Sequence, residues 1–281
     1  MRYDPIKDIF AKFIRKSVLL RWIVYKILDI VFLRSWYIRR ELKRILKNRR
    51  GKKTRILDAG SGFGQYSYFI SRKFPNTEIL AVDIKEEYLK DCREFFIRKN
   101  LMNVDFQNID LTKMNFENAF DLILCVDVME HIDDDVKVLQ NFYCSLRNDG
   151  YLIINTPSVF GGSDVHNQND ESFISEHFRT GYSKEELFDK LSWAGFRNNL
   201  GFYTYGFYGD IAWRILIKYP MILLNLNKWF LILLPLYYVL TLPLSLIMMF
   251  IDTKSKIDKG TGLITISLKK IDPNFYENKK A

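Results

Sequence analysis

Cysteine is scarce in this sequence of 281 residues, and no two of its cysteines form a CxxC pair. The wide spacing argues against a disulfide framework, which needs paired cysteines, and against a structural zinc site, which needs closely spaced ligands. Such usage favours a protein of a reducing compartment. The three cysteines are Cys92, Cys125 and Cys144.

The N-terminal region lacks the uninterrupted apolar run and the small-residue cleavage site of a secretory signal peptide. Basic residues interrupt each apolar stretch there, so we expect that the chain is not exported. These residues are Lys7, Lys12, Arg15, Lys16, Arg21 and Lys26.

Acidic residues are also scarce near the N-terminus. Residues 1–53 contain 17 Lys and Arg against 4 Asp and Glu, whereas the whole chain has a net charge of +9. A basic region on a mildly acidic body predicts an anionic partner, either lipid or nucleic acid. A solvated helical face is the alternative.

Short apolar segments alternate with helical ones between residues 55 and 156, which predicts an α/β fold with a parallel, doubly wound sheet. We expect a basic helical region over 1–50, a catalytic domain over 51–208 and 259–272, and a hydrophobic insertion over 209–258. The expected strands are 55–59, 78–83, 104–107, 120–126, 151–156, 196–207 and 263–268, and the expected helices of the domain are 66–74, 86–100, 136–146 and 183–196.

A glycine-rich turn follows the first expected strand, in the segment Gly60-Ser61-Gly62-Phe63-Gly64. Glycine permits a tight turn and a close approach of a ligand to the backbone, and ligands of open α/β sheets bind beyond the carboxyl ends of the strands. The GxGxG spacing differs from the GxGxxG dinucleotide fingerprint, and no GK[ST] of a P-loop follows.

Acidic residues lie at the ends of three successive expected strands. Asp58 precedes the first glycine by two positions, Asp83 ends the second strand, and Asp110 follows the third. A carboxylate at Asp83 can accept hydrogen bonds from both hydroxyls of a ribose, and Asp110 is placed to meet the exocyclic amine of adenine. Each acid alone is better explained as a turn residue or helix cap, but together beside the glycine turn they predict a nucleoside site.

These motifs resemble those of class I S-adenosylmethionine-dependent methyltransferases, and of O-methyltransferases of the ubiquinone-pathway type. The resemblance covers roughly residues 50–200 and the strand 263–268, and includes Leu57–Gly64, Phe120–Ile132, Leu146–Leu152 and His177–Leu187. It implies S-adenosylmethionine as the cofactor and a Rossmann-like seven-stranded methyltransferase sheet. To this sheet the sequence itself adds basic N-terminal helices and a hydrophobic helical insertion between the last two strands. The implied cofactor-binding residues are Asp58, Gly60, Gly62, Phe63, Gly64, Asp83, Ile84, Asp110, Leu111 and Val126.

Candidate catalytic residues follow the fourth strand in the segment Asp127-x-x-Glu130-His131. If this segment is helical, its three side chains share one face. His131 is then a candidate general base with Glu130 beside it. The resemblance offers a divalent metal as an alternative, because a similar Glu-x-x-Glu-His segment holds one in the ubiquinone-pathway enzymes, but Asp127 replaces the first Glu and we assign no metal ligand.

A third interpretation is that Glu130 and His131 orient the loop and contact the cofactor. His166 and His177, in the polar segment 161–179, are weaker catalytic candidates than His131. The sequence leaves these roles open.

The expected insertion contains 23 residues without a charge, Trp229 to Ile251, which is long enough for a membrane span. Pro235 and Pro243 interrupt this run, and we expect a proline-bent apolar wedge. The preceding residues 211–228 predict a basic amphipathic helix lying in a membrane interface, kinked at Pro220. The residues that share its polar arc are Arg214, Lys218, Asn225 and Lys228.

The topology of the resembled family limits how the insertion can meet a membrane. Its last two strands pair, so the strands that flank the insertion lie on one side of the bilayer and a single crossing is excluded. A re-entrant segment, a two-pass hairpin and an interfacial helix remain, and we expect monotopic attachment to the cytoplasmic face of a membrane, with the basic N-terminal helices on anionic lipid. A homodimer interface is the alternative.

The acceptor expected from this placement is a lipidic or lipid-linked small molecule, with O-methylation favoured by the resemblance alone. A nucleic-acid methyltransferase is one alternative, using the basic N-terminus. We expect no nucleic-acid partner, because residues 126–130 lack the Asn/Asp-Pro-Pro-Tyr loop that grips a base and the insertion is strongly apolar. A membrane scaffold that binds the cofactor without turnover is a second alternative.

Overall fold

The computed structural model describes residues 17–49, 51–161, 178–227 and 229–270. These divide into two compact units, and we describe each by itself. Unit 1 comprises the described residues of Met1–Lys47, Pro157–Ser175 and Phe202–Leu263, and unit 2 those of Asn48–Thr156, Glu176–Gly201 and Ile264–Ala281. The helices before the first strand therefore group with the residues of the expected insertion.

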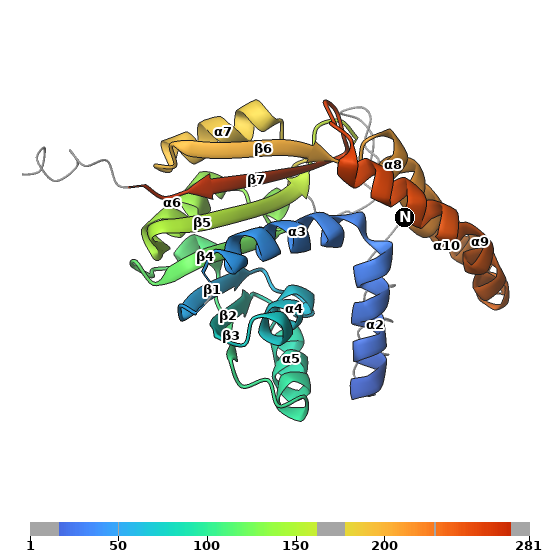
Figure 1. Cartoon of the computed structure of the whole chain (residues 1–281), viewed down its shortest axis with the longest axis horizontal. Helices are drawn as coiled ribbons and strands as arrows, with labels where there is room; N and C mark the ends of the chain where they lie inside the picture. Colours follow the sequence, from blue (N-terminus) through green and yellow to red (C-terminus); the bar gives the residue numbers. More distant parts are fainter. Residues whose placement is uncertain (1–16, 50, 162–177, 228, 271–281) are drawn as a thin grey trace, which may run out of the picture. The chain divides into compact units, whose positions relative to one another are not determined.

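Seven strands form one sheet in the order β3-β2-β1-β4-β5-β7-β6 (Figure 1). The strands are β1 (Thr54–Ala59), β2 (Thr77–Asp83), β3 (Val104–Asn108), β4 (Phe120–Val126), β5 (Leu146–Pro157), β6 (Asn198–Thr204) and β7 (Gly262–Leu268). Strands β1 to β5 pair in parallel. The chain builds outward from β1 to β2 and β3 and then returns to add β4 beside β1, so the strand order reverses between β1 and β4. Open α/β sheets bind their ligands at such a switch point.

Helices connect the strands, and the alternation expected from the sequence is confirmed. They are α4 (Gln65–Lys73), α5 (Glu86–Arg98), α6 (Asp135–Ser145) and α7 (Lys184–Trp193), with short 3₁₀ turns η1 (Leu111–Lys113) and η2 (Met129–His131). Strand β4 is buried along nearly its whole length, and the last four residues of β1 are buried. A strand covered on both faces needs a continuous apolar run, and this explains why these two strands were readable from the sequence.

Two strand boundaries differ from the prediction. Strand β5 begins at Leu146 instead of residue 151, because Leu146 pairs with Phe120 across an irregularity in the ladder before Tyr151 pairs with Leu122. The expected strand over 196–207 is shorter, since Tyr205 has a φ of 55°, which no extended strand adopts.

In unit 1 the N-terminal helices are α2 (Val18–Val31) and α3 (Leu33–Lys47). Helix α3 is joined to the last turn of α10 (Phe230–Lys254) by a buried carboxylate, Asp252. Its Oδ1 accepts a 2.7 Å hydrogen bond from the Tyr37 hydroxyl, and its Oδ2 accepts a 2.9 Å hydrogen bond from the Gly209 amide. Burial is the main cause that raises the pKa of the Asp252 carboxyl.

The expected insertion between the last two strands is present, and it is a helical hairpin (Figure 1). The first arm consists of α8 (Phe207–Trp213), a π-helical segment η4 (Arg214–Lys218) and α9 (Tyr219–Leu226), and the second arm is α10 (Phe230–Lys254). The arms lie side by side: the hydroxyls of Tyr237 and Tyr238 donate to Ile215 O at 2.7 Å and Leu216 O at 2.9 Å.

One expectation about this hairpin was wrong in detail. The first arm is not one regular α-helix, because the π-helical segment η4 interrupts the 3.6-residue period before Pro220. Helix α10 continues through Pro235 and Pro243, and the expected bend at these prolines stays a prediction.

Candidate active site

The glycine turn connects β1 to α4 at the switch point of the sheet. The amides of Gly60 and Ser61 both donate to Val82 O, each at 2.8 Å, which closes the turn against β2. Gly60, Gly62 and Gly64 have φ values of 76°, 51° and 73°, in the left-handed region that favours glycine. A Cβ on Gly60 would lie only 2.2 Å from Val128 Cγ2. The first glycine is thus required by both conformation and space.

The backbone at Gly62 borders open space, because a Cβ there would meet no heavy atom within 4 Å. The neighbouring Ser61 Oγ is buried and has no hydrogen-bond partner among the residues that the structure describes. Phe63 stacks on Tyr88 with 4.5 Å between the ring centroids. An open backbone edge beside an unsatisfied hydroxyl and an aromatic pair fits a nucleoside-containing cofactor such as S-adenosylmethionine.

Asp58 is buried beneath the turn. Its Oδ2 accepts hydrogen bonds from the Ser67 hydroxyl at 2.6 Å and the Ser67 amide at 3.1 Å, so it ties β1 to the first turn of α4. Burial raises the pKa of Asp58 to about 6. These contacts show how Asp58 supports the turn, and its direct contact with a cofactor stays a prediction.

Asp83 links β2 to the same turn. Its Oδ2 accepts a 2.9 Å hydrogen bond from the Gly62 amide, and its Oδ1 accepts one from the Lys85 amide at 2.9 Å. A carboxylate oxygen can accept more than one hydrogen bond, so both oxygens retain capacity for ribose hydroxyls. The adjacent Ile84 is exposed. The structure therefore brings together the two sequence motifs that were expected to share one ligand.

Asp110 is the N-cap of η1. Its Oδ1 accepts from the Thr112 amide at 2.9 Å and the Thr112 hydroxyl at 2.7 Å, and these hydrogen bonds lower the pKa of the Asp110 carboxyl. The helix-cap alternative is therefore realised here, and contact with adenine stays a prediction. The neighbouring Leu111 is buried, and Val126, at the end of β4, is half-buried.

The loop after β4 is not the regular helix that would place Asp127, Glu130 and His131 on one face. Asp127 has a φ of 53°, and only Met129–His131 form a short 3₁₀ helix. The side-chain Nδ2 of Asn155 donates to Asp127 Oδ1 at 2.6 Å, whereas the Thr156 hydroxyl donates to Glu130 Oε2 at 3.3 Å. Adjacent residues of a strand point to opposite faces of the sheet, so β5 holds the two acids on different sides.

No group of three His, Cys, Asp or Glu able to hold a metal occurs among the described residues. Within the loop, Glu130 is buried, while His131 is half-exposed. Accessibility favours His131 over Glu130 as the side chain that meets a substrate. Both catalytic assignments remain predictions, and His166 and His177 lie outside the described residues.

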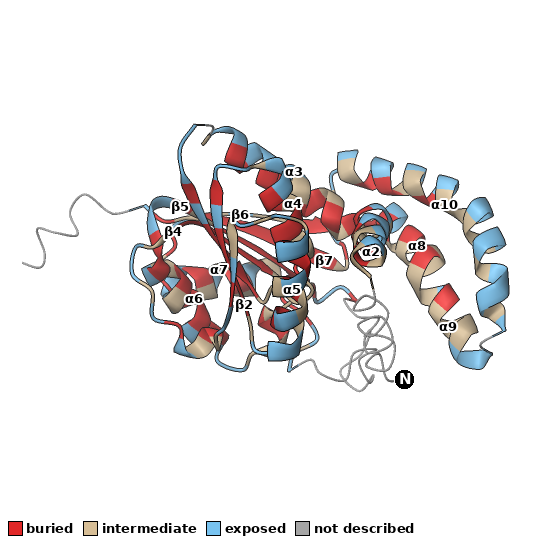
Figure 2. Ribbon diagram, turned by 90° about the horizontal axis from the view of Figure 1, so that it is seen from below, coloured by how far each residue is buried: buried red, intermediate tan, exposed pale blue. Residues whose placement is uncertain are grey.

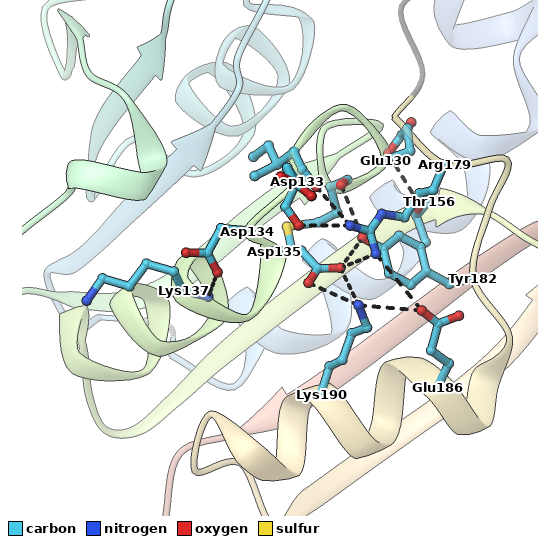
Figure 3. Close-up of polar contacts among 12 residues, drawn as sticks. Glu130, Asp133, Asp134, Asp135, Lys137, Thr156, Arg179, Tyr182, Glu186 and Lys190 are labelled. Carbon is cyan, nitrogen blue, oxygen red and sulfur yellow. Dashed lines mark hydrogen bonds and ion pairs between the residues drawn. The ribbon is translucent and has the colours of Figure 1, made fainter.

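A buried ionic cluster, which the sequence analysis did not identify, lies next to this loop (Figure 3). Asp135, at the start of α6, is buried and accepts from the Tyr182 hydroxyl at 2.7 Å, Lys190 Nζ at 2.8 Å and Arg179 Nη1 at 2.7 Å. Burial and the hydrogen bond to Asp135 raise the pKa of Tyr182. The sequence marked residues 177–187 by family resemblance, but no local pattern connects them to Asp135.

The family model described as a methyltransferase domain matches residues 50–193, just over half of the chain. This chain belongs to the class I S-adenosylmethionine-dependent methyltransferase family. The matched segment contains the glycine turn, the acids of β1 and β2, and the loop after β4. The predicted family and fold class are therefore confirmed.

Curated relatives match half of the chain or less. A malonyl-[acyl-carrier protein] O-methyltransferase of Bacillus cereus is 28% identical over 143 residues, 47% of this chain and 51% of the relative. An (S)-coclaurine N-methyltransferase of Thalictrum flavum is 26% identical over 99 residues, 35% of this chain and 27% of the relative. The chain spans about half the length of the curated relatives it matches, or less.

Solved structures share the fold. Phosphoethanolamine N-methyltransferase 2 of Haemonchus contortus, in complex with S-adenosyl-L-methionine, superposes with a TM-score of 0.57 at 19% identity, covering 81% of this chain and 52% of that one. A putative sarcosine dimethylglycine methyltransferase of Galdieria sulphuraria superposes with a TM-score of 0.53 at 16% identity, covering 78% of each chain. At these identities the likeness concerns the fold.

Proposed function

We propose that this chain transfers the methyl group of S-adenosylmethionine to an oxygen of a lipidic or lipid-linked small molecule at the cytoplasmic face of a membrane. The observation that carries the transferase part is the glycine turn at the switch point, where Asp83 binds the Gly62 amide beside open space. The observation that carries the membrane part is the exposed apolar hairpin of unit 1.

The cofactor supplies a methyl group that is already activated by its positive sulfur. The chain's residues therefore need to bind the nucleoside, align the acceptor and exclude water. His131, half-exposed after β4, is the candidate that takes a proton from an acceptor hydroxyl. The name of the Bacillus cereus relative specifies O-methylation, which supports oxygen as the acceptor atom.

Most apolar residues of α10 are exposed or half-exposed (Figure 2). Helix α10 is the one helix of the described residues that is long and apolar enough to cross a membrane, and 6% of its most apolar window is buried. Val239 and Leu240 are each 70% exposed. Contiguous apolar surface on this scale marks a membrane or protein contact.

Both ends of the hairpin carry polar groups. Near the base, Arg214 pairs with Asp210 at 2.7 Å. At the tip, Asn227 Oδ1 accepts from the Trp229 amide at 2.9 Å. A hairpin lying in the interface presents both ends to the headgroups and its apolar sides to the acyl chains. Because both arms return to neighbouring strands, β6 and β7, this arrangement satisfies the topology without a crossing.

Helix α2 supplies further apolar surface in the same unit. Leu19, Ile23, Ile27 and Ile30 are exposed and recur at the spacing of one helical face, whereas Val24 faces inward. Between residues 17 and 49 the sequence has nine Lys and Arg against two acids. This combination of apolar stripe and positive charge fits an anionic lipid surface.

The membrane part is tested by flotation of the full chain with vesicles of neutral phosphatidylcholine, with and without anionic phosphatidylglycerol. We expect wild-type protein to float, more completely with anionic lipid, and the double variant Val239→Glu and Leu240→Glu to stay in the lower fraction. Ile97→Glu is the matched control, because Ile97 is 65% exposed on α5 of unit 2. Wild-type protein that stays monodisperse and unbound without detergent contradicts attachment.

The catalytic part is tested with methyl-labelled S-adenosylmethionine and a total lipid extract of the native membrane, followed by mass spectrometry. We expect one labelled lipid class with the methyl group on oxygen. Label on RNA added to the same reaction, or no label on any lipid despite cofactor binding, contradicts the proposal.

A further inference from the structure

The loop after β4 is held by several hydrogen bonds from one short segment, residues 178–182. The amides of Phe178 and Arg179 both donate to Glu130 O, at 2.9 and 3.2 Å. Arg179 Nη2 donates to Ile132 O at 3.1 Å and to Asp133 O at 3.0 Å. Three backbone carbonyls of the loop that carries Glu130 and His131 thus depend on this segment (Figure 3).

The loop needs such donors because η2 is only three residues long. A short helix leaves its last carbonyls without partners in the helix, and buried carbonyls require donors from elsewhere. The guanidinium group presents several N–H donors in a rigid plane, so one arginine can serve two carbonyls and a carboxylate together. A lysine ammonium in the same place cannot span all three.

Asp135 fixes the direction of the Arg179 side chain. Its Oδ2 lies 2.7 Å from Arg179 Nη1, and Lys190 and Tyr182 hold the same carboxylate from α7 and the segment before it. Arg179 also lies over the Tyr182 ring, with 5.1 Å from Cζ to the centroid. The side chain is 19% exposed and that of Asp135 3%, so this ion pair is largely shielded from water.

We propose that Arg179 is a positioning residue for methyl transfer, which holds the Glu130–Asp133 loop in the conformation that presents His131 to the acceptor. The inference rests on the proposed function in one respect, since it assumes that this loop faces the reacting groups. It assigns to Arg179, Asp135 and Tyr182 a role in the site although none of them need touch a substrate.

The test compares Arg179→Lys with Arg49→Lys in the full chain with S-adenosylhomocysteine. Arg49 is a close match, because its guanidinium also joins a carboxylate, Asp121 at 3.0 Å, to a carbonyl, Asp149 O at 2.6 Å, and its side chain is 20% exposed. Arg49 precedes β1 and therefore lies at the opposite end of the strands from the loop.

Hydrogen exchange of the peptide 127–134 is the first measurement. The amides of His131 and Ile132 bond to Val128 O and Met129 O, and their protection reports the loop conformation. We expect exchange at least about tenfold faster in Arg179→Lys, corresponding to the loss of one or two net hydrogen bonds, and unchanged exchange in Arg49→Lys. The second measurement is the NMR signal of the His131 ring, assigned with His131→Gln among the three histidines of the chain; we expect it to shift or broaden in Arg179→Lys alone.

Unchanged exchange and an unchanged His131 signal in Arg179→Lys overturn the proposal, as does an equal effect of Arg49→Lys. If Arg179→Lys does not fold, the variant Tyr182→Phe replaces it in the test. This variant keeps the Arg179 guanidinium but removes the hydroxyl that donates to Asp135 and lies 3.1 Å from Met129 O. A loop that exchanges as in wild type in a folded Tyr182→Phe variant then overturns it. Neither measurement requires an acceptor, so failure of the lipid assay and failure of this inference are separate results.

Discussion

Replacing Gly60 by alanine tests the glycine turn most directly. The φ of 76° costs a residue with a Cβ about 1–2 kcal/mol. The added Cβ would also lie 2.2 Å from Val128 Cγ2, and relieving such overpacking costs about 1–3 kcal/mol. We therefore expect Gly60→Ala to lower the free energy of unfolding by about 2–5 kcal/mol.

Gly62→Ala is the matched control for this substitution. Its φ is 51°, but the new Cβ meets no heavy atom within 4 Å, so only the conformational cost of about 1–2 kcal/mol remains. The methyl group would project into the space assigned to the cofactor. We expect Gly62→Ala to weaken binding of S-adenosylhomocysteine at least tenfold, with a smaller loss of stability than Gly60→Ala.

The assay pairs urea unfolding with calorimetric titration of S-adenosylhomocysteine. Val128→Ala removes both methyl groups that the new Cβ at position 60 would meet and leaves only the Cβ of residue 128, 3.3 Å away. The double variant Gly60→Ala, Val128→Ala should therefore recover the steric part of the lost stability and retain the conformational part. A Gly60→Ala protein as stable as wild type refutes the steric reasoning. Undiminished binding by Gly62→Ala refutes the placement of the cofactor, and no binding by wild type removes the assignment altogether.

Three further predictions concern single side chains. Folding raises the pKa of Asp58 from 3.8 to about 6, so the contribution of this carboxyl to stability is lost as pH rises from about 4 to 6. Asp58→Asn should therefore flatten this part of the plot of unfolding free energy against pH, measured by urea unfolding. An unaltered slope contradicts the prediction. Tyr37→Phe leaves the buried Asp252 with one donor fewer, so the hairpin base should lose about 1–3 kcal/mol, seen as faster proteolysis within 206–262, with Tyr208→Phe as an exposed control. His131→Ala should lower methyl transfer to the lipid extract by about 100-fold or more, with or without chelator; full activity removes His131 as the base.

Much of the fold was predictable because its signals are local. Strands β1 and β4 are covered on both faces, and their continuous apolar runs appear directly in the sequence. The α7 cap was also readable, since Ser183 Oγ accepts from the Glu186 amide at 3.0 Å as its spacing predicts. The boundaries that failed depend on irregular pairing at β5 and on the left-handed Tyr205, which have no periodic signature.

The candidate site was predictable only in part. The glycines and Asp83 were found because each lies at a strand end, and parallel strand ends meet at one edge of a sheet. The expected shared face of Asp127, Glu130 and His131 failed because Asp127 adopts a left-handed conformation ahead of a three-residue helix. Arg179 was missed because its partners belong to α6 and the β4 loop, far away in the sequence.

The sequence by itself determined the family, the glycine turn and the apolar character of residues 229–251, since each depends on residue type at short spacing. Only the tertiary structure decided that Asp83 binds the turn, that β5 separates Asp127 from Glu130, and that the apolar segment folds back against its neighbour as a hairpin. These are contacts between distant segments, and a side chain's local pattern specifies what it can bond to but not which partner the folded chain brings within reach.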